Sequence, residues 1–165
     1  MKIALRLVLL AALAALGVWL WMILFPSPEK VIRQRFSALA RAASSSADDS
    51  DLMRLAAGQN VAGFFSTNVE LKVEIPNFND HSSVEREEIA QAVVIGRSRS
   101  GGLKVTFPDV NVAVNPDKLS AVADVTVDAD VRGEHDSFLQ EMKFTLHKVD
   151  GQWLIIRVET VRVLS

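Results

Sequence analysis

Arg157 and Glu159 are the two side chains whose types and spacing best suit chemistry on a small molecule. They stand two residues apart in an alternating polar and apolar segment, so in a β-strand both would lie on one face of the sheet. A guanidinium and a carboxylate held side by side could grip a polar ligand or act in general acid–base catalysis. The alternative is a structural ion pair, at the rim of the sheet or satisfied within the core.

Asp150-Gly151 predicts which residues share that face. The dipeptide is a strong signal for a two-residue β-hairpin turn. Regular pairing away from this turn places Phe144 opposite Arg157 and Met142 opposite Glu159. This face is the more apolar one, so we expect it to line a cavity covered by helices. The candidate pocket-lining residues are Met142, Phe144, Trp153, Ile155, Arg157 and Glu159.

The three histidines give weaker signals. His81 and His135 fall in predicted loops, and His147 lies on the more polar face of a predicted strand. None has the close His/acid spacing of a metal site. The aspartates of 124–130 alternate along one strand, which separates them by about 6.6–7 Å, too wide for one ion. We therefore predict no catalytic set, no metal site and no cofactor.

The elements that must position these residues divide into two halves. From Leu103 onward the apolar residues recur at every second position, which predicts four consecutive antiparallel strands with turns near 115–118, 132–137 and 150–151. Before them, the three- and four-residue spacing of apolar residues after Pro28 predicts a helix over 29–43. The remaining predictions are a short helix capped by Ser50 or Asp51 and stopped by Gly58, a strand over 69–75, and a helix from Val84 to about Ser98 capped by Ser82 or Ser83.

The N-terminal segment predicts a membrane anchor. From Leu7 to Phe25 the chain has no charge, and a helix of that length nearly spans the ~30 Å hydrocarbon core. A cleaved signal peptide is the alternative, but the run is long and no small-residue cleavage site follows it. We expect residues 3–25 to lie in the bilayer as a single pass, with the N-terminus inside and the domain periplasmic or otherwise extracytoplasmic.

Composition limits the rest of the chain. The 18 basic and 20 acidic residues give a formal net charge of −2, and both basic residues at 2 and 6 precede the apolar run. The globular part is therefore acidic, which disfavours nucleic-acid binding. The sequence has no cysteine and hence no disulfide. We expect two parts: a cytoplasmic tip and transmembrane anchor over 1–27, and one α+β domain over 28–165, with helices packed on a curved antiparallel sheet.

This order of elements resembles the nuclear transport factor 2-like superfamily, which includes SnoaL-like proteins and ketosteroid isomerases. The closing hairpin, from Lys148 through Asp150-Gly151 and Trp153 to Ile155, is similar to the ending of that superfamily. The resemblance covers roughly residues 28–165 and implies a cone-shaped α+β fold, a pocket between sheet and helices, and dimerisation through the sheet. Ketosteroid isomerases use a tyrosine, and this chain has none.

Function follows only in outline. We expect a membrane-anchored binding or assembly module, with a membrane-proximal protein or a small apolar ligand as its partner, and a homodimer through the sheet as a further expectation. The alternative is an isomerase, lyase or hydrolase that uses Arg157 and Glu159 in a pocket. Fold alone does not choose between them.

Overall fold

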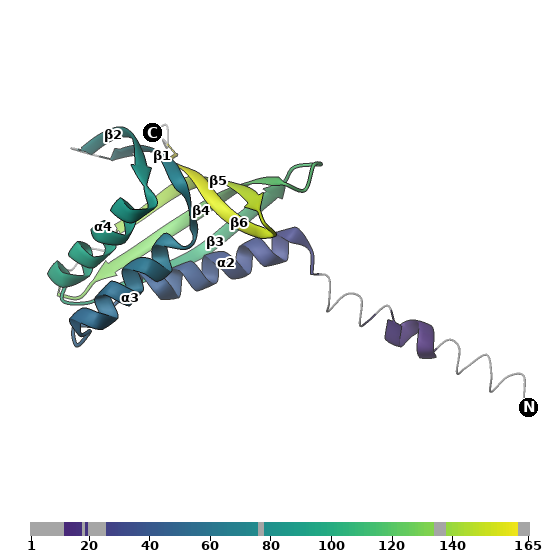
Figure 1. The fold of residues 1–165 in the computed structure, drawn as a ribbon, viewed down its shortest axis with the longest axis horizontal. Coiled ribbons are helices and arrows are strands. Elements are labelled where there is room, and N and C mark those ends of the chain that lie inside the picture. The colour runs from purple at the N-terminus through teal and green to yellow at the C-terminus, as the bar shows by residue number, and fades with distance from the viewer. Residues whose placement is uncertain (1–11, 18, 20–25, 76–77, 134–137, 162–165) are drawn as a thin grey trace, which may run out of the picture.

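The computed structural model describes residues 12–17, 19, 26–75, 78–133 and 138–161. Three helices cover one face of a six-stranded sheet (Figure 1). The strands lie side by side in the order β2-β1-β6-β5-β4-β3. The helices are α2 (Pro28–Ala43), α3 (Asp51–Ala62) and α4 (Arg86–Arg99); the strands are β1 (Phe65–Ile75), β2 (Phe78–Glu85), β3 (Leu103–Val114), β4 (Ser120–Val131), β5 (Phe138–Val149) and β6 (Gln152–Thr160). The predicted α+β class, with helices on a curved sheet, is confirmed.

Helix α2 matches its prediction. Pro28 stands in the first turn, and the hydroxyl of Ser27 accepts a hydrogen bond from the amide of Lys30, which caps the helix. One stripe of α2 is buried in the core of the domain, with Ile32 fully buried and Phe36 nearly so. The rings of Phe36 and of Phe144 on β5 pack in a T-shaped arrangement, with 5.2 Å between centroids.

Helix α3 begins where predicted but ends later. The Ser50 hydroxyl accepts from the amide of Met53, as an N-cap does. The predicted stop at Gly58 is wrong, because the helix continues through this buried glycine to Ala62. A Cβ atom at Gly58 would lie 2.7 Å from the carbonyl oxygen of Ala90 on α4. The glycine therefore permits close packing of two helices rather than ending one.

The segment before α4 also differs from its prediction. Residues 78–85 form strand β2, which the sequence did not predict, and pair antiparallel with β1. The helix accordingly starts at Arg86 and not at Val84. Its cap is not Ser82 or Ser83 but a capping box in which Glu85 and Glu88 each bond the other's backbone amide.

The sheet is mixed, which corrects the prediction of an antiparallel one. Strands β3 to β6 are antiparallel as predicted, but β1 lies parallel to β6. The first strand of the chain therefore joins the last, after the helices α2 and α3 have crossed the face of the sheet (Figure 1). Parallel strands cannot be joined by a tight hairpin, and here the connection from β1 to β6 runs through β2, α4, β3, β4 and β5.

The predicted anchor falls largely outside the described residues. Of residues 3–25, only 12–17 and 19 are described; they are helical, and Leu13, Leu16 and Trp19 are exposed. Within the described parts of the chain, no helix is long and apolar enough to cross a membrane. The anchor thus remains a prediction from the sequence.

Candidate functional site

An apolar cavity of about 560 Å³ lies between α4 and the sheet. It exists because α4 packs mainly on α3, through the close approach at Gly58, and meets the sheet chiefly at β1 and β2. The part of α4 that extends beyond those strands stands above β3, β4 and β5. Side chains from both layers line the space between them.

The lining is almost entirely apolar. The sheet contributes side chains from all six strands, among them Phe107, Val127, Met142 and Phe144, and α4 contributes Ile89 and Val93. The full set is Leu39, Ala43, Val61, Phe65, Leu71, Val84, Glu88, Ile89, Ala92, Val93, Gly96, Arg97, Leu103, Val105, Phe107, Val127, Met142, Phe144 and Val158.

Four of the six candidate pocket residues face this side of the sheet. Met142 and Phe144 line the cavity itself. Trp153 and Ile155 are 2% and 3% exposed in the adjoining core, beside α2. The void that those two line holds about 10 Å³, enough for at most one water molecule.

Arg157 and Glu159 do not line the cavity, and the predicted register is wrong from Ile156 onward. Leu146 pairs with Ile155, but the next residue of β5, Thr145, pairs with Arg157. Ile156 therefore has no partner on β5 and forms a bulge, which sends the following residues to opposite faces from those predicted. Val158 takes the place on the cavity face that regular alternation had assigned to Arg157 and Glu159.

The two charged side chains instead make ion pairs with β1 on the other face of the sheet. Arg157 lies 2.6 Å from the carboxylate of Glu70, and Glu159 lies 3.5 Å from the ammonium of Lys72. All four side chains are between 28% and 56% exposed. These are surface pairs, of the structural kind that was the alternative reading of the motif.

The two charged residues that do line the cavity are already engaged. Glu88 accepts from the amide of Glu85 in the capping box of α4. Arg97 is nearly buried, and its guanidinium lies 2.9 Å from the carboxylate of Asp49. The same guanidinium donates to the backbone carbonyls of Ala42 and Ser44 at the end of α2.

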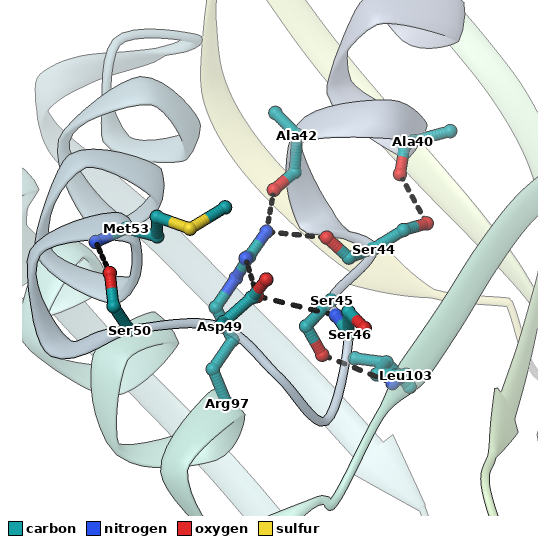
Figure 2. Close-up of polar contacts among 10 residues, drawn as sticks. All are labelled: Ala40, Ala42, Ser44, Ser45, Ser46, Asp49, Ser50, Met53, Arg97 and Leu103. Atoms are coloured by element: carbon teal, nitrogen blue, oxygen red, sulfur yellow. Dashed lines mark hydrogen bonds and ion pairs between the residues drawn. The ribbon is translucent and has the colours of Figure 1, made fainter.

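Figure 2 shows this guanidinium between α2 and the loop that follows it. The carboxylate of Asp49 also accepts from the amide of Ser46, so the loop is held at both ends. The C-terminal carbonyls of a helix carry partial negative charge, which a cation satisfies. No local pattern in the sequence indicates this cluster, because Arg97 is 48 positions from Asp49 and reads as one more polar residue of a helix.

The described residues hold no group of three or more histidine, aspartate or glutamate side chains that could bind a metal. His147 is exposed on β5, away from the cavity lining. His135 lies outside the described residues, and the side chain of His81 is not described.

Solved structures of other proteins share this architecture. A provisionally named aromatic ring hydroxylase from Novosphingobium aromaticivorans matches with a TM-score of 0.62 at 11% identity, over 83% of this chain and 90% of that one. A nuclear transport factor 2-like protein of unknown function from Pseudomonas putida KT2440 matches with a TM-score of 0.59 at 11% identity, over 83% and 87%. A provisionally named scytalone dehydratase from N. aromaticivorans matches at 0.56 and 17% identity, over 81% and 83%. The domain has the nuclear transport factor 2-like fold.

The fold expected from the element order is therefore confirmed, and the cavity lies where a nuclear transport factor 2-like domain is expected to have its pocket. No protein-family model matches the chain, and no curated protein matches it either. Identities of 11–17% establish the fold alone. The chemistry of this nuclear transport factor 2-like domain must be argued from its own side chains.

Proposed function

We propose that this chain is a membrane-anchored binding module whose domain takes a small apolar ligand into the cavity under α4. The observation that carries the proposal is the lining: 560 Å³ of space walled by aliphatic and aromatic side chains. Small-molecule sites commonly measure about 300–1,000 Å³ and are mostly apolar. Filling such a space removes apolar surface from water, at roughly 25 cal/mol per Å².

The charged groups of the wall favour a ligand recognised by shape rather than by charge. The guanidinium of Arg97 is held by Asp49 and by two backbone carbonyls, and the carboxylate of Glu88 is held in a helix cap. A ligand that recruited either group would have to break these contacts. A neutral ring system or hydrocarbon chain could bind without breaking these contacts.

The membrane part of the proposal rests on the sequence. Residues 3–25 would anchor the chain in the bilayer, with the N-terminus inside and the domain extracytoplasmic. Since Ser27 already caps α2, almost no linker separates the anchor from the domain. A ligand that partitions into the membrane, or a membrane-proximal protein, would thus be within reach. Dimerisation through the sheet also remains a prediction.

The catalytic alternative required Arg157 and Glu159 in the pocket. Both side chains lie on the opposite face of the sheet, in ion pairs with Glu70 and Lys72. That placement removes the observation on which an isomerase, lyase or hydrolase was inferred, and the cavity lining favours binding.

The test is calorimetric titration of the full chain, held in lipid nanodiscs, with the neutral bicyclic aromatic 1-naphthol. Empty nanodiscs provide the reference for partition into lipid. We expect saturable heat from the wild type and its loss in Ala92→Phe, because Ala92 lines the cavity from α4 and a phenyl ring there would occupy it. Val127→Phe, which fills the cavity from the sheet, should act in the same way.

Two controls make the result specific. Ala56→Phe adds the same ring to an exposed position of α3 that does not line the cavity, and should leave binding intact. Arg157→Ala should also leave it intact, since that side chain faces away. Equal heats from Ala92→Phe and the wild type would refute the cavity as the site, and loss of binding in Arg157→Ala would revive the alternative.

A further inference from the structure

The end of the domain nearest the predicted anchor is defined by α2 and two β-turns. Helix α2 runs alongside β3, with Arg33 donating to the carbonyl of Val110 and Ser44, eleven residues later, bonded to Val105. The start of α2 therefore lies at the end of the sheet where β3 turns into β4. The hairpin turn between β5 and β6 lies at that same end, from which the chain leaves toward its N-terminus (Figure 1).

Both turns present an apolar side chain to solvent. Leu119, in the β3–β4 turn, is 58% exposed, and Val149, at the end of β5, is 45% exposed. The two residues lie close together, because the amide of Lys148, next to Val149, donates to the carbonyl of Leu119 over 2.8 Å. Single exposed apolar residues are ordinary, so their position and neighbours must carry the inference.

Each apolar residue has a lysine next to it. Lys118 and Lys148 are both exposed. Of the acidic groups nearby, Asp117 is exposed, and its carboxylate accepts from the amides of Leu119 and Ser120 and from the Ser120 hydroxyl, which hold it against its own turn. Asp150, at the tip of the β5–β6 turn, is exposed as well.

We propose that this end of the domain, with Leu119, Val149, Lys118 and Lys148, docks on the surface of the lipid bilayer that holds the N-terminal segment. The proposal rests on the membrane anchoring proposed above. The apolar side chains would enter the interface, while the lysines would meet the anionic phosphates of the lipid. Lysine side chains suit this position because their stems can lie along apolar surface.

The short connection between the proposed anchor and α2 favours this docking. Pro26 and Ser27 can span at most roughly 7 Å when extended. The start of α2 is thus held close to the bilayer, together with the two turns at the same end. Tethering of this kind supplies a high effective concentration, so that even two apolar tips and two lysines can maintain contact.

The absence of cysteine from the sequence permits a clean test. The full chain with Leu119→Cys carries a single environment-sensitive fluorophore, NBD, in nanodiscs of phosphatidylcholine and phosphatidylglycerol that contain doxyl-labelled lipid. The matched control is Leu52→Cys, which replaces a leucine 77% exposed at the start of α3, at the opposite end of the domain (Figure 1). We expect a blue-shifted emission and quenching by doxyl lipid at position 119, and neither at position 52.

The charges give a second, independent readout. A variant that carries both Lys118→Glu and Lys148→Glu should show less quenching at position 119. Nanodiscs of phosphatidylcholine alone should lower the quenching too. Equal quenching at positions 119 and 52 in nanodisc-bound chain would overturn the docking while leaving the anchor intact. A blue shift at position 119 in native membrane vesicles, together with no quenching by doxyl lipid in the nanodiscs, would also overturn the docking on lipid, in favour of a protein partner. Elution of the chain free of nanodiscs would overturn the anchor, and the docking with it.

Discussion

Replacing Gly58 by alanine should destabilise the domain, whereas the same change at Gly96 should stabilise it. Both glycines lie inside helices, Gly58 in α3 and Gly96 in α4. A new Cβ atom at Gly58 would lie 2.7 Å from the carbonyl oxygen of Ala90 and 2.9 Å from a methyl group of Val94. Val94 can rotate, but the carbonyl belongs to the backbone of α4, so the two helices must separate. At Gly96 no atom outside the local helix lies within 4 Å of the new Cβ.

The size of the difference follows from two terms. Alanine is better than glycine in a helix by about 0.8–1.0 kcal/mol, and this gain applies to both variants. Overpacking applies to Gly58→Ala alone and costs about 1–3 kcal/mol. The difference between the variants therefore isolates the packing term. For a chain of this size, each kcal/mol shifts Tm by roughly 2–4 °C.

The assay is thermal unfolding of the full chain in detergent micelles, followed by far-UV circular dichroism. Gly96→Ala should melt above the wild type by up to about 4 °C and Gly58→Ala should melt below Gly96→Ala by at least about 2 °C. Equal gains in Tm for the two variants would show that α3 and α4 do not approach as closely as 2.7 Å requires. The origin assigned to the cavity would then fail as well, since it depends on α4 packing on α3.

Two further predictions concern charged groups. Arg97→Met leaves the carboxylate of Asp49, whose side chain is 10% exposed, without its cation, and breaking such a buried pair should lower the free energy of unfolding by about 3–5 kcal/mol; a urea-unfolding midpoint unchanged from the wild type would contradict this. Hydrogen bonds, chiefly from the amide of Leu119, lower the pKa of Asp117, so its contribution to the turn is present above its ordinary value of about 3.9 and is lost as the pH falls through the lower folded value. A carboxyl carbon titration by NMR, with Asp117→Asn to assign the signal, checks the midpoint, and a value at or above 3.9 would refute it.

The elements that the sequence predicted well are those with strong local signals. Pro28 and Ser27 specify the start of α2 without help from the rest of the fold. Asp150 and Gly151 both adopt positive φ angles, 48° and 80°, as a two-residue hairpin turn requires. Each of these signals depends on residues within a few positions of one another, so the local sequence pattern is enough to predict the structure.

The elements that it missed depend on contacts between distant segments. Strand β2 exists as the partner of β1, and its residues are polar enough to read as a loop before a helix. Gly58 carries the ordinary signal of a helix end, and only the carbonyl of Ala90, on another helix, reveals why a glycine stands there. The ion pair of Arg97 with Asp49 likewise joins two segments that no periodicity relates.

The chemical character of the cavity depends on one such hidden feature, the bulge at Ile156. Without that extra residue, regular alternation would continue along β6 and carry Arg157 and Glu159 onto the cavity face, as a one-residue shift of register does. Both charges would then lose most of their water, which they could offset only by pairing well with each other or with a polar ligand. With the bulge, Val158 joins the cavity wall and the charged residues reach Glu70 and Lys72 at the surface. One inserted residue thus decides whether the pocket of this fold is polar or apolar. Likeness of fold to differently named proteins therefore does not identify the ligand class, which depends on the residues of β6 itself.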